Sequence, residues 1–295
     1  AGDASARLDW TAPLSDGGSA ITGYRVDRSI DGGVTWTTIV ASTGSTSTSV
    51  TISGLTNGAA VLLRIAAING VGTGAASVPV AVTPRSVASA PISLTAMPSD
   101  QQLSLSWAAP TSNGGSAITG YRVEISTTSG TSWSTAVDTS GPATAVVLTG
   151  LTNGLATLVR VSAITSAGVG ASSTPVSATP AAVPGRPGTP VVIAGDASVS
   201  LIWAAPTSTG GSPITGYVVE ISADAGATWS TATTVVAASA TISGLVNGAS
   251  YAFRVRAVNA AGTGLPSGLA PATPAGVPGA PINLALAAGN AQVVA

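Results

Sequence analysis

The sequence predicts an all-β protein in which seven-stranded sandwiches follow one another as an extended rod. A stretch that begins at Ser53 returns in similar form at Thr149 and again at Ser243. Within each copy apolar and polar residues alternate, which is the period of a strand with one buried face. Turn residues separate such stretches at the spacing typical of an all-β sandwich. No segment has the 3.6-residue period of a helix, so we expect helix to be nearly absent.

Tryptophan marks the length of the repeating unit. Trp10 returns as Trp107 after 97 residues and as Trp203 after a further 96. This period fits a small independently folding domain better than a solenoid repeat. We therefore expect modules at residues 1–84, 88–180 and 184–274, and the first strand and part of the second strand of a fourth module at 278–295. The first module begins without a counterpart of the first strand.

The second module illustrates the strands that we expect in each repeat. They are roughly Ile92–Met97, Gln102–Trp107, Ile118–Ser126, Ser132–Val137, Thr144–Thr149, Thr157–Thr165 and Ser173–Ala178. Pro-rich joints follow the last strand of each module, and proline partly stiffens such a joint because its φ angle is fixed.

Composition excludes several classes of function. The chain has no Cys and no His, and all ten basic residues are Arg, so it lacks thiolate chemistry, the usual general base and the commonest metal ligand. Only 7% of residues are charged, against about 25% in ordinary proteins. The scattered charges form no basic stripe for nucleic acid, and no apolar run approaches the ~18 residues that membrane insertion needs. We expect no cofactor, no nucleic-acid partner and no membrane insertion.

One short motif is a candidate for binding chemistry. Residues 29–36 and 222–229 have the pattern Ser-x-Asp-x-Gly-x-Thr-Trp, which is similar to the Asp box of sialidases, and Thr128 replaces the Asp in the second module. We interpret the motif as a hairpin in which Asp binds backbone N–H groups and Trp covers the turn. The alternative is a glycan or calcium site, but one Asp among Gly and Thr cannot supply six to eight oxygen ligands.

The remaining charged residues suggest no catalytic site. Glu124 and Glu220 occupy equivalent outward positions in different modules, and the carboxylates are too isolated for an acid–base pair within one site. Three arginines share one outward position on the sixth strand: Arg64, Arg160 and Arg254. We interpret them as solubilising surface residues, with a ladder that binds a partner as the alternative. We predict no catalytic, cofactor-binding or metal-binding residues.

Repeated motifs identify a family. Trp lies on the second strand, Ile-Thr-Gly-Tyr on the third, and Gly-Leu-x-Asn-Gly precedes an Arg-containing sixth strand. This set resembles the fibronectin type III domain, an immunoglobulin-like sandwich, and more narrowly the repeats of secreted bacterial proteins. The resemblance covers essentially the whole chain. It implies that Trp packs in the core with the tyrosine of the third strand, which is Tyr24, Tyr121 or Tyr217.

The resemblance also implies a tyrosine at the corner before the sixth strand. The third module has it as Tyr251, whereas Val61 and Thr157 stand there in the first and second modules. A hydroxyl-to-backbone hydrogen bond contributes about 0.5–1.5 kcal/mol. We therefore expect the first two modules to be less stable than the third.

We interpret the chain as a non-catalytic structural array of a secreted or cell-surface bacterial protein, such as a stalk, adhesin shaft, filament or surface layer. The alternative is a set of spacer modules in a secreted polysaccharide-degrading enzyme. Either function places the chain outside the cell or on its surface. A glycan partner has no support, because the tryptophans occupy core or hairpin positions.

The C-terminal tail suggests one way to assemble. Residues 276–295 align with Ala182–Leu201, so the tail carries a copy of the first strand that the first module does not show. One interpretation is an excerpt of a longer array, with neighbouring domains of the same chain as partners. The other is strand donation to other copies of the protein by residues 282–287, with Ile282, Leu284 and Leu286 as candidate partner-binding residues.

Overall fold

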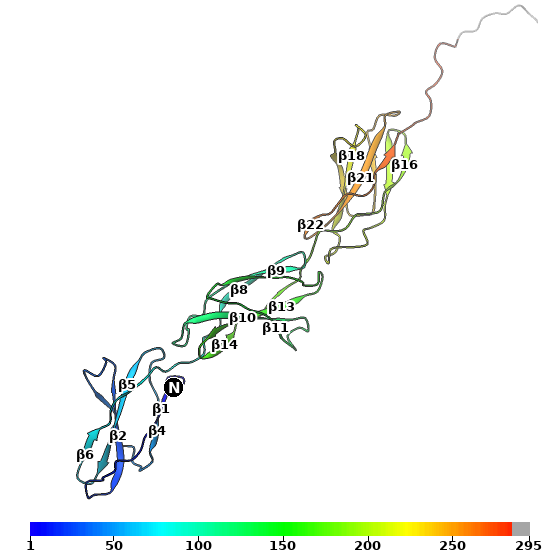
Figure 1. Cartoon of the computed structure of the whole chain (residues 1–295). Helices are drawn as coiled ribbons and strands as arrows, with labels where there is room; N and C mark the ends of the chain where they lie inside the picture. The colour runs from blue at the N-terminus through cyan, green and yellow to red at the C-terminus, as the bar shows by residue number, and fades with distance from the viewer. Residues whose placement is uncertain (285–295) are drawn as a thin grey trace, which may run out of the picture. The chain divides into compact units, whose positions relative to one another are not determined.

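The structure is a computed structural model that describes residues 1–284 of the chain (Figure 1). Every regular element in this part is a strand, as the sequence predicts. Residues 1–284 contain no helix with the length and hydropathy needed to cross a membrane. The first two modules, called modules one and two, belong to one compact unit, and module three belongs to another.

Each module contains two antiparallel sheets. The strands of module one are β1 (Ala6–Asp9), β2 (Ile21–Ser29), β3 (Thr37–Val40), β4 (Ser49–Ile52), β5 (Val61–Asn69), β6 (Thr73–Ala76) and β7 (Val80–Val82). Those of module two are β8 (Ile92–Ser99), β9 (Gln102–Ala108), β10 (Ile118–Ser126), β11 (Ser134–Asp138), β12 (Ala145–Leu148), β13 (Thr157–Thr165), β14 (Gly168–Ser172) and β15 (Val176–Ala178). Those of module three are β16 (Val191–Gly195), β17 (Ser198–Ile202), β18 (Gly216–Ser222), β19 (Ser230–Val235), β20 (Ser239–Ser243), β21 (Tyr251–Asn259), β22 (Gly262–Thr263) and β23 (Ala270–Ala272).

The larger sheet has the same order in all modules. In module two it runs β11-β10-β13-β14, and β15 also pairs with β13. The smaller sheet runs β12-β9-β8 in module two and β16-β17-β20 in module three. In module one the smaller sheet contains β1 and β4 alone within the described residues. Module one therefore shows no counterpart of β8 or β16.

The expected strands overlap the observed ones, with one error in module two. The last expected strand, Ser173–Ala178, is observed only at its end as β15, and β14 was not expected. The physical reason lies at Ser173, whose buried side chain accepts a hydrogen bond from the Val161 N–H at 3.1 Å. Pro175 follows and has no N–H to donate to a neighbouring strand. The chain therefore stops pairing with β13 after β14 and pairs with it again as β15.

The core of each module joins the two sheets through aromatic rings. In module two Trp107 and Tyr121 meet edge to face, with ring centroids 5.2 Å apart. The corresponding distances are 4.9 Å for Trp10 and Tyr24 and 5.4 Å for Trp203 and Tyr217. Such pairs contribute about 0.5–1.5 kcal/mol beyond the burial of their area. The predicted packing of these residues is confirmed.

The corner before the sixth strand differs among the modules. In module three the Tyr251 hydroxyl accepts a hydrogen bond from the Val246 N–H at 3.2 Å. Val61 of module one is buried in the core, and Thr157 of module two is also buried and donates to the Leu155 carbonyl at 3.2 Å. Module two therefore has an unexpected hydrogen bond at this corner, although it ties a different backbone group.

We predict that Tyr251→Phe destabilises module three by about 0.5–1.5 kcal/mol, because the Val246 N–H loses its acceptor. Differential scanning calorimetry of the full chain measures the change. Val61→Ile, which adds no polar group, is the control in module one and should leave the transition of module three unchanged. An unaltered transition of module three in Tyr251→Phe would contradict the prediction.

Candidate functional site: a repeated tryptophan, arginine and carboxylate cluster

The Asp motif forms a tight hairpin in module one. Asp31 accepts hydrogen bonds from the Thr35 N–H at 2.9 Å and from the Thr35 hydroxyl, and the Ser29 hydroxyl donates to it at 2.7 Å. These hydrogen bonds, that of the Thr35 hydroxyl foremost, hold the pKa of Asp31 well below its usual value. The Trp36 indole N–H donates to the Gly33 carbonyl at 3.0 Å and folds the ring over the turn. The carboxylate is thus engaged by its own hairpin.

Modules two and three build the same hairpin. In module three Ser222 and Thr228 donate to Asp224, and the pKa of this carboxyl is lowered for the same reason. In module two the Thr128 hydroxyl takes the place of the carboxylate and accepts from the Ser132 N–H at 3.0 Å. A neutral hydroxyl satisfies the turn without an anion, which favours the hairpin interpretation over a calcium site. Residues 1–284 hold no group of three or more acidic residues placed to bind a metal.

Each hairpin tryptophan is covered by an arginine from the sixth strand. The guanidinium carbon of Arg64 lies 4.0 Å from the centroid of the Trp36 ring. The equivalent distances are 4.2 Å for Arg160 over Trp133 and 4.0 Å for Arg254 over Trp229. This is the geometry of a cation–π interaction, which contributes about 0.5–1 kcal/mol at an exposed site.

A carboxylate on the neighbouring strand completes the cluster. Strand register places it directly opposite the arginine on β2, β10 or β18. The Arg Nε to carboxylate distances are 3.1 Å for Arg64–Asp27, 2.9 Å for Arg160–Glu124 and 2.5 Å for Arg254–Glu220. We call each set of tryptophan, arginine and carboxylate the Trp–Arg–acid cluster.

The clusters of modules one and three hold extra charges. Asp27, whose side chain is only 4% exposed, also pairs with Arg25 at 3.1 Å and accepts from the Thr38 hydroxyl. Glu220 pairs with Arg256 at 3.1 Å as well as with Arg254. Burial alone would raise the pKa of both carboxyls, but these hydrogen bonds and positive charges outweigh it and lower the pKa below its ordinary value.

The Trp–Arg–acid cluster corrects one interpretation made from the sequence. The arginines are not free solubilising residues, because each arginine is stacked and paired within its own module. Glu124 and Glu220 lie in different modules, and each pairs with the arginine opposite it. The sequence pattern did not reveal the cluster, because it does not state which outward positions face each other across the third and sixth strands. The available signal for the cluster was that Asp27 of module one, like Glu124 at the equivalent position of module two, is acidic.

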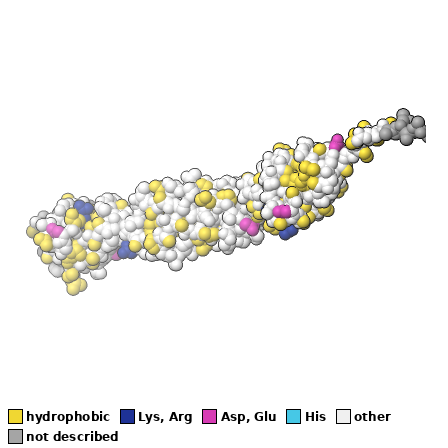
Figure 2. Space-filling view, turned by 90° about the horizontal axis from the view of Figure 1, so that it is seen from above, with side chains coloured by type: hydrophobic (Ala, Val, Ile, Leu, Met, Phe, Trp, Pro, Cys, Tyr) yellow, Lys and Arg dark blue, Asp and Glu magenta, His cyan; other side chains and the backbone are white. Residues whose placement is uncertain are grey.

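The arrangement is suited to holding a module together rather than to chemistry. Within each cluster the carboxylate faces an arginine and not a second carboxylate. One face of the molecule accordingly shows few and widely separated charged side chains among neutral ones (Figure 2).

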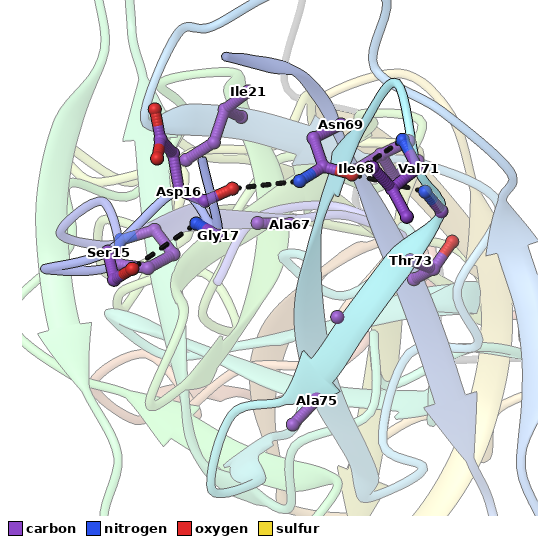
Figure 3. Close-up of a pocket in the computed structure, with 13 residues that line it drawn as sticks. Ser15, Asp16, Gly17, Ile21, Ala67, Ile68, Asn69, Val71, Thr73 and Ala75 are labelled. Atoms are coloured by element: carbon purple, nitrogen blue, oxygen red, sulfur yellow. Dashed lines mark hydrogen bonds between the residues drawn. The ribbon is translucent and has the colours of Figure 1, made fainter. Parts of the chain in front are cut away.

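A cavity of about 590 Å³ lies in module one between the loop before β2 and the turn that joins β5 to β6 (Figure 3). The side-chain amide of Asn69 donates to the Asp16 carbonyl at 2.8 Å, and its oxygen accepts from the N–H groups of Val71 and Gly72. Ser15 and Gly17 line the opposite wall. We call this the module-one groove. It was not expected from the sequence, because two loops far apart in the chain form it.

Ile282 and Leu284, two of the candidate strand-donor residues, pair with no strand among the described residues. Ile282 and Leu284 have 85% and 92% of their surface exposed. Leu286 lies outside the described residues. The role of all three therefore stays a prediction.

The family model for the fibronectin type III domain matches the chain at residues 1–83, 89–179 and 186–273. The chain is 30% identical over 198 residues to human myomesin-2 and 32% identical over 197 residues to the chicken M-protein of striated muscle. Each alignment covers 65% of this chain, and the chain spans only 13% of the length of either relative. The crystal structure of the chicken CNTN1 FN1–FN3 domains is 21% identical, covers 92% of this chain and 95% of its own, and has a TM-score of 0.39.

We predict a favourable coupling of about 0.5–1 kcal/mol between Trp133 and Arg160, because truncating either residue removes the stacking of the guanidinium on the ring. A double-mutant cycle of Trp133→Ala and Arg160→Ala, followed by chemical denaturation, measures it. Trp133→Ala combined with Tyr251→Phe in another module is the control and should be additive. Full additivity within the Trp133–Arg160 pair would contradict the assigned cation–π interaction.

We also predict that Glu220→Gln destabilises module three at pH 7 and that the difference from the wild type shrinks as the pH falls. The folded pKa of Glu220 is lowered, so its contribution is present above its unfolded value of about 4.3 and is lost as the pH drops through the folded value. Thermal unfolding between pH 7 and pH 3 checks this. Tyr251→Phe, which changes no charge, is the control. A difference that stays constant with pH would refute the prediction.

Proposed function

Because this chain belongs to the fibronectin type III family, we propose that it is a non-catalytic structural array whose modules transmit mechanical load within a larger assembly. The observation that carries the proposal is the Trp–Arg–acid cluster. It occurs in all three modules. Its internal contacts occupy the aromatic and charged side chains that a binding or catalytic site would otherwise use. The feature that the three modules share is therefore one that stabilises their fold.

The pairs of facing strands in the larger sheets support a load-bearing role. β10 and β13 are paired along Ile118–Ser126, and β2–β5 and β18–β21 are paired in the same way. Ladders of this length must break many hydrogen bonds together when a module is pulled apart. The Trp–Arg–acid cluster bridges the same two strands and the adjoining hairpin, so it adds resistance where the strands would separate.

The structural role is supported by the relatives, and the location by the sequence alone. One of the relatives is named as a protein of striated muscle, which agrees with a structural array. The proposal also includes a place outside the cell or on a bacterial cell surface, as a stalk, shaft, filament or surface layer. That part rests on the repeat motifs and the low charge of the chain, and the human and chicken relatives give it no support.

Force spectroscopy of the chain, held near its two ends, tests the load-bearing role. We expect three discrete unfolding events, each releasing roughly 300 Å of contour length, because about 90 residues extend by ~3.3–3.6 Å each. Arg160→Ala should lower the force of one event, and Val236→Asp, a change at an exposed loop position, should lower none. Smooth extension without discrete events would contradict a load-bearing array.

A further inference from the structure

The linker between modules one and two, which lie in the same compact unit, is hydrogen-bonded to both of them. The Arg85 N–H donates to the Gly2 carbonyl of module one at 3.1 Å. The next N–H along the chain, that of Ser86, donates to the Gly114 carbonyl of module two at 2.9 Å. Because consecutive amides bind opposite modules, a bend of the linker at this point would break one of the two hydrogen bonds.

Each end of this linker is anchored in the module that it adjoins. Pro84 is buried, and its carbonyl accepts a hydrogen bond from the Gly58 N–H of module one at 2.9 Å. Ala88 is only 2% exposed and belongs to the core cluster of module two. Its carbonyl accepts from the Ala171 N–H at 3.1 Å. The linker therefore passes from one module to the other without a stretch of unbonded backbone at residues 84–88.

Two glycines bring the backbones of modules one and two into direct contact beside the linker. Gly58 lies in the corner before β5, and Gly115 lies in the loop before β10. A Cβ at Gly58 would lie 2.8 Å from the Gly115 Cα, and a Cβ at Gly115 would collide with the Gly58 nitrogen. Only residues without a Cβ allow the two backbones to approach this closely.

Asn57 fixes the corner of module one that carries Gly58. Its side-chain oxygen accepts from the Ala4 N–H at 2.8 Å, and its amide donates to the Asp3 carboxylate at 2.7 Å. These two hydrogen bonds hold the corner within its own module. The same amide also donates to the Ser86 hydroxyl of the linker at 3.2 Å. The corner is therefore a shaped surface, and it is tied to the linker that leads into module two.

The second compact unit contains the same arrangement within itself, because it includes Thr152–Gly154 as well as module three. A Cβ at Gly154 would lie 3.1 Å from the Gly211 Cα. The linker of this unit also donates to the glycine loop, from the Ala182 N–H to the Gly210 carbonyl at 2.8 Å. The close approach of two glycines beside a bonded linker is therefore a repeated feature of the chain.

We propose that the Asn57–Gly58 corner is a docking surface for module two, and that it accepts only a partner loop with glycine at the position of Gly115. Together with the bonded linker, this contact holds modules one and two in one orientation as a single rigid body. A side chain at either glycine forces the two loops apart and breaks the hydrogen bonds of the linker. The proposal concerns the orientation of the modules and not their resistance to force, so it is independent of the load-bearing role.

Gly54 offers a control that separates docking from backbone strain. Gly54 and Gly58 both have left-handed backbones, with φ of 73° and 80°. Alanine at either position is therefore strained to a similar degree within module one. A Cβ at Gly54 meets no atom within 4 Å, whereas a Cβ at Gly58 collides with module two. A difference between Gly54→Ala and Gly58→Ala thus reports the contact between the modules.

Double electron–electron resonance on the full 295-residue chain tests the proposal, because a chain without cysteine can be spin-labelled at chosen positions. Thr51→Cys in β4 and Val147→Cys in β12 place labels at equivalent exposed positions of modules one and two. Thr135→Cys combined with Val147→Cys, both within module two, measures the width that the labels alone produce. We expect the distance distribution between the modules to be as narrow as the one within module two.

Gly58→Ala and Gly115→Ala, each added to the labelled pair, should abolish the narrow distribution, and Gly54→Ala should preserve it. Calorimetry of the same variants should still show the unfolding transitions of all modules. A broad distribution between the modules in the labelled chain without a glycine change overturns the proposal. So does a narrow distribution in Gly58→Ala or Gly115→Ala, or a loss of the narrow distribution in Gly54→Ala that equals the loss in Gly58→Ala.

Discussion

The edge-to-face contact between one tryptophan and one tyrosine in every module is the interaction on which the rest of the structure depends. Trp107 comes from the smaller sheet and Tyr121 from the larger, so their contact fixes the two sheets against each other. The fully buried valines 123, 159 and 161 fill the space around the pair. Because aromatic rings bury the largest area of any side chains, this pair is a large part of a core that otherwise consists of aliphatic residues.

With its sheets fixed, each module places one arginine and one carboxylate opposite each other on a face of the larger sheet. The strand register that buries Tyr121 and Val123 also turns Glu124 outward and opposite Arg160. The hairpin that follows brings Trp133 under the guanidinium. The Trp–Arg–acid cluster is therefore a consequence of register and hairpin geometry together. It places several of the few charged residues of the chain in contacts within their own module.

How well the sequence predicted each feature depends on how far apart in the chain the interacting residues lie. The alternating period and the turn residues are local, and they were sufficient for the sandwich and for most of its strands, whereas the packing of Trp107 with Tyr121 was predicted from the resemblance to the fibronectin type III domain. β14 was missed because it is a short edge strand of Gly, Ser, Val and Ala without alternation. The pairing of Arg160 with Glu124 depends on strand register, and the module-one groove depends on two distant loops, so neither was visible in the local pattern.

The segment that leads into the first strand of modules two and three belongs to the sandwich that follows it. In module two its residue Ala88 lies in the core together with Leu94 of β8, and in module three its prolines are buried on the equivalent surface. A module is therefore complete only with an extended segment on its groove and on the edge of its smaller sheet.

Amide hydrogen exchange of the native chain tests this central claim most directly. The amide of Gly185, which donates to the Ser208 carbonyl, should exchange as slowly as the strand amides of module three, because the segment opens only together with its module. A Gly185 amide that exchanges as fast as an unbonded loop amide would contradict the account.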